Sequence, residues 1–71
     1  MKLQPGDAGA LTAHAFLLRL RGRYQDAVAV LERSLAIAPG FAPSLIEMAR
    51  LARHEGLPER ARGLCRAKAI M

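Results

Sequence analysis

A period of 34 residues runs through this chain and limits the architectures that it can adopt. When the sequence is shifted by 34 positions, seven of the 30 residue pairs from residue 8 onward are identical. In a chain rich in Ala, Leu and Arg, roughly three identities are expected by chance, so their positions matter more than their number. The identical pairs join Ala8, Leu11, Ala15, Leu17, Arg19, Gly22 and Ala27 to Ala42, Leu45, Ala49, Leu51, Arg53, Gly56 and Ala61.

The composition favours helices over sheets. Hydrophobic residues make up 52% of the 71-residue chain, but aromatic residues only 4%, and there is no Trp. The apolar content therefore rests on Ala and Leu, which favour helix packing on helix. A chain of this length forms one domain at most and buries only about 60% of its unfolded surface. We predict an all-α fold made of antiparallel helix-turn-helix repeats.

Turn and capping residues place the first two helices. Asp7 is a suitable N-cap for a helix over about residues 9 to 21, and Gly22 is suited to end it. A second helix over about residues 24 to 36 stops before Pro39. Because the connection is only two or three residues long, these helices are expected to be antiparallel neighbours.

Two more helices are predicted in the second half of the chain. The third has Pro43 in its first turn and is expected to close at Gly56. The fourth begins at Pro58-Glu59, and Gly63 in its interior costs roughly 1 kcal/mol relative to Ala. We therefore expect the last helix to be the least stable of the four.

The residues that carry the period resemble the tetratricopeptide repeat, whose unit is a helix, a tight turn, a second helix and a Pro near the exit. The second unit departs from the pattern at Pro58, Cys65 and Lys68, where an aromatic, a large apolar and a small residue are usual. In the first unit the pattern positions hold Leu11, Ala15, Gly22-Arg23-Tyr24, Ala27, Leu31, Ser34 and Pro39.

The resemblance implies a segment of an α-α superhelix with three parts. Residues 1–7, which include Pro5-Gly6, are expected to be a lead-in that resembles the end of a preceding repeat. Residues 8–41 form the first unit, and residues 42–71 form a second unit that is truncated at its C-terminal end. Repeat arrays usually need three or more units to cover their apolar faces, so the face with Leu64, Cys65 and Ile70 is expected to meet water.

No pattern in the chain is typical of catalysis. It has no Gly-rich phosphate loop and no paired carboxylates, and its two His residues lie on separate units. His14 falls at a packing position of its helix, and Cys65 replaces a core residue, so both are interpreted as core side chains. We predict a protein that is not an enzyme and has no cofactor and no metal. One Cys alone forms no internal disulfide, which is compatible with a cytoplasmic location.

The net charge of +5 raises the question of nucleic acid or membrane as a partner. The fourth predicted helix carries a basic cluster, but there is no interleaved aromatic platform on which bases would stack, so we do not expect nucleic-acid binding. The longest apolar stretch, residues 8–18, is interrupted by Thr12 and His14, so no membrane span is expected. The cluster consists of Arg60, Arg62, Arg66 and Lys68.

The resemblance also predicts a binding surface, because the first helix of each unit lines the concave face in this family. Equivalent positions project in the same direction, so an apolar strip is expected beside a basic one. Such a groove suits a peptide with a hydrophobic anchor and carboxylates; the alternative is that the arginines only solvate a helix face. The candidate partner-binding residues are Thr12, Phe16, Arg19, Ile46, Arg50, Arg53 and His54.

These observations predict a protein-protein interaction module, acting as a scaffold or adaptor. Its partner would be a protein or peptide in the groove, or a second copy of the chain in a homo-oligomer formed through the open repeat ends. The groove is not expected to hold chaperone C-termini, because Thr12 and Phe16 stand where that clamp has Lys and Asn. An alternative is a non-catalytic segment of a larger enzyme, such as a transferase, that recruits substrate.

Overall fold

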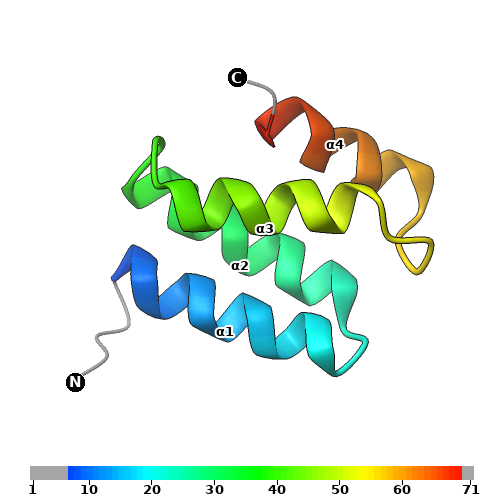
Figure 1. Cartoon of the computed structure of the whole chain (residues 1–71), viewed down its shortest axis with the longest axis horizontal. Coiled ribbons are helices and arrows are strands. Elements are labelled where there is room, and N and C mark those ends of the chain that lie inside the picture. The colour runs from blue at the N-terminus through cyan, green and yellow to red at the C-terminus, as the bar shows by residue number, and fades with distance from the viewer. Residues whose placement is uncertain (1–6, 70–71) are drawn as a thin grey trace.

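Four helices form two antiparallel hairpins (Figure 1). The computed structural model describes residues 7–69 of the chain. Helix α1 spans Ala8–Leu20, α2 Tyr24–Ile37, α3 Ala42–Ala52 and α4 Glu59–Ala69, and no strand occurs within the described residues. The prediction of an all-α fold is confirmed. Pro5-Gly6 and Ile70, for which the sequence analysis made predictions, lie outside the described residues.

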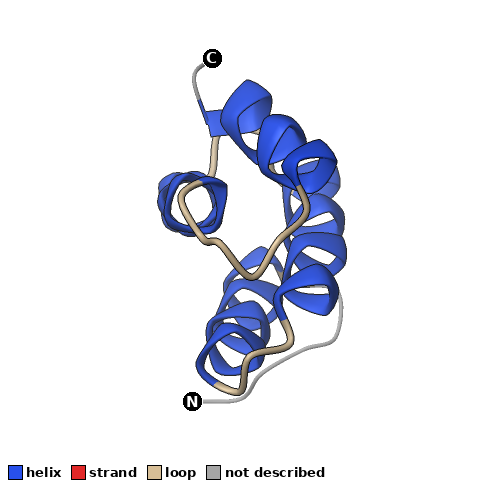
Figure 2. Cartoon of the chain, turned by 90° about the vertical axis from the view of Figure 1, so that its right-hand side faces the viewer, coloured by secondary structure: helices blue, strands red, loops and turns tan. Residues whose placement is uncertain are grey.

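The hairpins lie side by side, with α3 packed on α2 and on α1 as well as on α4. In the side view the helices lie in two layers (Figure 2). The molecule measures 35 × 27 × 14 Å. Each of the four helices keeps an exposed face, because each carries side chains that are open to solvent. None of the described helices is long and apolar enough to cross a membrane.

Capping at both ends fixes the length of α1. The Asp7 carboxylate accepts a hydrogen bond from the backbone N–H of Gly9 at 2.7 Å, which satisfies one of the free donors of the first turn. At the other end Gly22 has φ of 79°, and the N–H of Arg23 reaches back to the carbonyl of Leu18 at 2.9 Å. Both predicted caps are confirmed, and the tight turn sends α2 back along α1.

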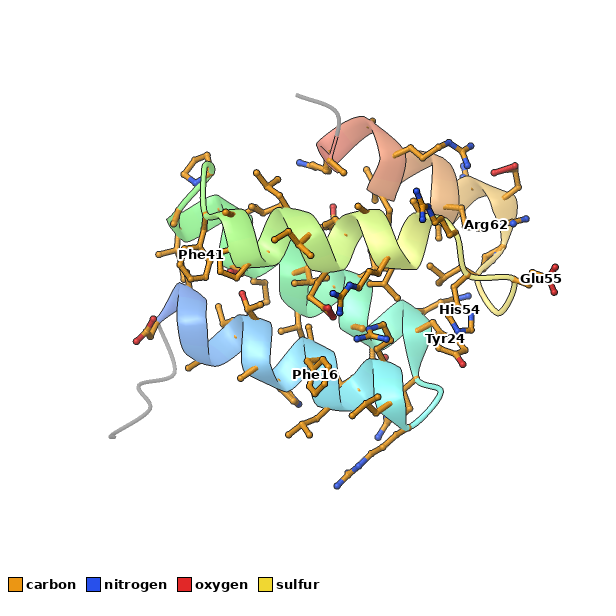
Figure 3. All side chains as sticks on the ribbon, in the orientation of Figure 1. Phe16, Tyr24, Phe41, His54, Glu55 and Arg62 are labelled. Carbon is orange, nitrogen blue, oxygen red and sulfur yellow. The ribbon has the colours of Figure 1, made fainter. Side chains whose placement is uncertain are left out.

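Gly56 does not end α3, contrary to the prediction from its pairing with Gly22. The helix stops at Ala52, and Gly56 lacks the positive φ of Gly22. Its role is steric, because a Cβ there would overlap the ring of Tyr24. The imidazole of His54 stacks on that ring with 3.8 Å between centroids and accepts a hydrogen bond at Nδ1 from the Gly56 N–H at 3.1 Å (Figure 3).

Both hairpins contribute to one core. Ala15 on α1 and Ala27 on α2 are both buried in it, and such small side chains let two helices pack closely. Cys65 is completely buried, which confirms its interpretation as a core side chain; the expectation that it shares a face open to water is wrong, although Leu64 beside it is 37% exposed. The core consists of Ala15, Leu18, Ala27, Val28, Leu31, Leu35, Met48, Leu51, Ala52, Leu57 and Cys65.

His14 is exposed, so its interpretation as a core residue is wrong. The equivalent residue of the second unit, Met48, is completely buried, and the next pair behaves in the same way: Leu17 is 52% exposed whereas Leu51 is buried. The face of α3 that carries Met48 and Leu51 packs against the first hairpin. No described helix covers the corresponding face of α1, which explains the difference.

Replacing Gly56 by Ala is expected to destabilise the fold. The added Cβ pushes the Tyr24 ring away and disrupts its stack on His54, and overpacking of this kind costs about 1 to 3 kcal/mol. Urea unfolding followed by circular dichroism measures the change. The matched control is Gly40→Ala, because a Cβ at Gly40 has no heavy atom within 4 Å. Equal stability of the two variants would contradict the steric role of Gly56.

Candidate functional site

Three buried hydroxyl groups join α1, α2 and α3. Thr12 Oγ1 lies 2.6 Å from Ser44 Oγ and 3.2 Å from Ser34 Oγ, and the two serine oxygens are 2.7 Å apart. The carbonyl of Ala8 accepts hydrogen bonds from Thr12 at 2.8 Å and from Ser34 at 3.0 Å. This hydroxyl cluster gives the polar groups at the junction partners without water, so the contact between the hairpins has a defined register.

A buried ion pair continues the junction along α3. Glu47 is only 6% exposed, and its Oε1 accepts a hydrogen bond from Nε of Arg19 on α1 at 2.9 Å. The second carboxylate oxygen lies 3.4 Å from Arg19 Nη2 and 3.6 Å from Arg50 Nη1. Arg19 is therefore engaged within the protein, whereas the side chain of Arg50 is 59% exposed and has its guanidinium near the surface.

A groove of about 500 Å³ opens between α1 and α3 beside this junction. Its apolar members include Phe16 on α1 and Ile46 on α3, which are 39% and 52% exposed, and Phe41, which immediately precedes α3. Figure 3 shows Phe16 and Phe41 along the same side of the molecule. The groove is lined by Gly9, Thr12, Ala13, Phe16, Phe41, Pro43, Ile46, Glu47 and Arg50.

Four of the seven candidate residues from the sequence meet in this groove: Thr12, Phe16, Ile46 and Arg50. Arg19 lies next to them, with its guanidinium carbon 5.1 Å from the centroid of the Phe16 ring. The other two lie elsewhere. Arg53 belongs to a separate hollow between α3 and α4, and His54 stacks on Tyr24 in the turn after α3.

The sequence analysis missed some groove residues for two different reasons. Phe41 and Pro43 belong to the connection between the units and the start of α3, which a comparison of helix positions leaves out. Their signal was an aromatic residue beside Pro39-Gly40, just before a helix start. Glu47 was not among the candidate residues, because its contact with Arg19, 28 positions away, has no local pattern in the sequence.

A second hollow of similar size, about 520 Å³, lies on the opposite side of the hairpins, between α2 and α4. Leu64 is its main exposed apolar residue, and Glu32 and Arg60 are its charged members. It therefore lacks the pair of large exposed apolar side chains that marks the groove between α1 and α3. Its remaining lining residues are Gln25, Val28, Ala29, Pro58 and Ala61.

The pKa values of two side chains on α4, Cys65 and Glu59, are shifted by the groups around them. Burial raises the pKa of the Cys65 thiol, and the charge of Glu32 raises it further, so the group stays a neutral thiol. The hydrogen bond and charge of Arg66, with the charge of Arg62, lower the pKa of the exposed Glu59. Within the described residues, no group of three His, Cys, Asp or Glu side chains is placed to hold a metal ion.

Comparison with known families identifies the architecture. A family model for the tetratricopeptide repeat matches residues 18–67, from within α1 to within α4. The chain belongs to the tetratricopeptide repeat family. Tetratricopeptide repeats generally mediate protein-protein interaction and are typically non-catalytic scaffolds. Neither curated proteins nor solved structures gave a significant match to the chain.

In this tetratricopeptide repeat chain, Glu47→Gln is expected to lower the free energy of unfolding by about 2 to 3 kcal/mol, because it leaves the half-buried Arg19 without its counter-charge. The control is Asp26→Asn, which removes the exposed pair with Arg23 and should cost less than about 1 kcal/mol. Chemical denaturation of both variants tests this. A Glu47→Gln variant as stable as the wild type would show that the buried pair does not hold the junction.

Proposed function

We propose that this tetratricopeptide repeat chain acts as a scaffold or adaptor that binds a protein or peptide in the groove between α1 and α3. The observation that carries the proposal is the pair of exposed apolar side chains, Phe16 and Ile46, that face one hollow beside an exposed guanidinium. An apolar anchor gains free energy by leaving water there. The chain has a single Cys, so its fold does not depend on a disulfide, and we place this function in the cytoplasm.

The groove favours a partner that combines an apolar side chain with a carboxylate. Arg50 lies 3.6 Å from Glu47, a distance too long for a good hydrogen bond, so its donors remain available to an incoming carboxylate. The guanidinium of Arg19 lies over the Phe16 ring and forms an ion pair with Glu47. Thr12 forms part of the floor.

Two further candidate residues have a role only for a longer partner. Arg53 caps the C-terminal end of α3, and His54 follows it in the turn, so both lie beyond the groove. A bound chain that runs along α3 past Arg50 would reach them. In this proposal they extend the basic strip but do not form the apolar anchor site.

A panel of fluorescein-labelled decapeptides tests the groove. Each peptide has a central Leu or Phe flanked by Glu in one series and by Lys in a matched series. We expect the Glu series to bind more tightly, Phe16→Ala to weaken it by about tenfold, and Arg50→Glu to reverse the preference toward the Lys series. Fluorescence anisotropy measures the affinities.

The matched control for the charge reversal is Arg33→Glu, which changes an exposed arginine of α2 that does not line the groove. It should leave the preference for Glu peptides unchanged. If Arg50→Glu and Arg33→Glu have equal effects, net charge and not the groove accounts for binding. Peptide affinities that are unaffected by Phe16→Ala would also overturn the proposal.

The uncovered face of α1 supports a second proposal, homo-oligomerisation. Leu17 and Leu20 are 52% and 62% exposed, and the residues equivalent to Leu17 and His14 in α3 are buried against another hairpin. Two copies that pack α1 against α1 would remove these leucines from water. Because both copies would use the same face, the contact has two-fold symmetry and ends at a dimer.

Sedimentation equilibrium over a concentration series tests this dimer. We expect reversible dimerisation of the wild type and a monomer for Leu17→Glu, because the substitution places a charge in the apolar contact. Ile37→Glu is the matched control, since Ile37 is equally exposed at 52% but lies on α2. A monomeric wild type, or a dimer that survives Leu17→Glu, would contradict the proposed face.

A further inference from the structure

A hollow of about 260 Å³ lies between α3 and α4, away from the groove. It is lined by three alanines and two arginines, so it combines an apolar surface with positive charge. The lining residues are Ala49, Ala52, Arg53, Arg66 and Ala69. None of them lines the groove between α1 and α3.

The internal repeat shows what such a hollow accommodates. Four of the residues 34 positions earlier lie where α3 packs on the first hairpin: three share the core with Met48 and Leu51, and one is the arginine that binds Glu47. Ala15, Leu18 and Leu35 are at most 8% exposed. Arg19 donates a hydrogen bond to the Glu47 carboxylate of α3 at 2.9 Å. These equivalent residues are Ala15, Leu18, Arg19, Glu32 and Leu35. The hollow between α3 and α4 is thus a second version of a surface that binds a helix.

The two versions differ in charge. In the first hairpin, the position of Arg66 is held by Glu32, which lines the hollow between α2 and α4, and Arg19 binds the carboxylate of Glu47 from the incoming helix. In the second hairpin Arg66 stands in the place of Glu32. The register also places Lys68 where Ser34 contacts the incoming helix. The surface between α3 and α4 is therefore more positive than its equivalent on the first hairpin, and a helix that packs on it needs more acidic residues.

Arg53 is the part of this surface that corresponds to Arg19. Arg19 binds Glu47, but among the described residues no carboxylate lies within ion-pair distance of Arg53. Arg66 is paired at 3.0 Å with Glu59, which is exposed and on the same helix. A buried guanidinium is costly without a counter-charge, so a helix that covers Arg53 has to bring a carboxylate.

We propose that the surface formed by Ala49, Ala52, Arg53, Arg66 and Ala69 binds an acidic amphipathic helix of a partner protein. The partner helix would place a carboxylate on Arg53, as Glu47 is placed on Arg19, and large apolar side chains where Met48 and Leu51 lie on the first hairpin. A second acidic residue one turn earlier, at the position equivalent to Ser44, would face Lys68. This interface is separate from the proposed peptide groove.

A second copy of the chain does not meet this requirement. The helix that would dock by the repeat register is α1, and its residues matching Ser44, Glu47, Met48 and Leu51 are Ala10, Ala13, His14 and Leu17. Helix α1 contains no acidic residue. Docking it here would bury Arg53 against Ala13 with no counter-charge. The charges of the surface therefore favour a different protein as the partner.

The chain's own α3 supplies a probe, because α3 is the helix that binds the equivalent surface. The probe is a side-chain-stapled, fluorescein-labelled peptide of residues 41–53 with Ser44→Glu, which keeps Glu47, Met48 and Leu51. The matched peptide carries Gln at both positions, 44 and 47. We expect the Glu peptide to bind the full chain about tenfold or more tightly than the Gln peptide.

Variants of the chain locate the bound peptide. Arg53→Glu and the milder Arg53→Gln should each lower the affinity of the chain for the Glu peptide by about tenfold or more. Arg50→Glu in the groove and Arg33→Glu on α2 should each change its affinity by less than about twofold. Circular dichroism of each variant confirms that helicity is retained before affinity is compared.

Several results would overturn the proposal. The Glu peptide could fail to bind, or the Gln peptide could bind as tightly as the Glu peptide. The two Arg53 variants could also bind the Glu peptide with the affinity of the wild type. Loss of binding in Arg50→Glu alone would place the peptide in the groove, which supports the proposed function but not this surface. A wild-type dimer that Arg53→Glu dissociates would show that a second copy occupies it.

Discussion

The polar groups buried between α1, α2 and α3 determine how the second hairpin sits on the first. Apolar packing is not directional, whereas the hydrogen bonds of the hydroxyl cluster and of the Arg19–Glu47 pair are satisfied in only one arrangement. That arrangement turns the other faces of α3 outward in fixed directions. Ile46 and Arg50 line the groove with α1, while Ala49, Ala52 and Arg53 line the hollow with α4. Both proposed binding surfaces therefore depend on the same buried contacts.

Local signals in the sequence were sufficient for most of the fold. The 34-residue period, Asp7, Gly22 and the short connection after the first helix predicted the helices and their antiparallel packing, because capping and turns depend on nearby residues. Part of the groove was predicted from the repeat itself, since Thr12 and Ile46 are equivalent positions of neighbouring units and both line it.

The remaining features depend on neighbours that a periodic pattern does not specify. Gly22 and Gly56 are equivalent in sequence, but one supplies a positive φ and the other makes room for Tyr24. His14 and Met48 are likewise equivalent, yet only Met48 is covered by another hairpin. Equivalent positions share a direction along the array, but their burial depends on whether a further element packs there.

The central claim is that the groove between α1 and α3 is the surface that binds a protein partner. The most direct test is a two-dimensional ¹H–¹⁵N nuclear magnetic resonance titration of the labelled chain with the tightest-binding decapeptide of the Glu series. The account predicts that the largest shift changes occur in residues 9–16 and 41–50. Changes confined to α2 and α4, around the hollow that contains Leu64, would contradict it.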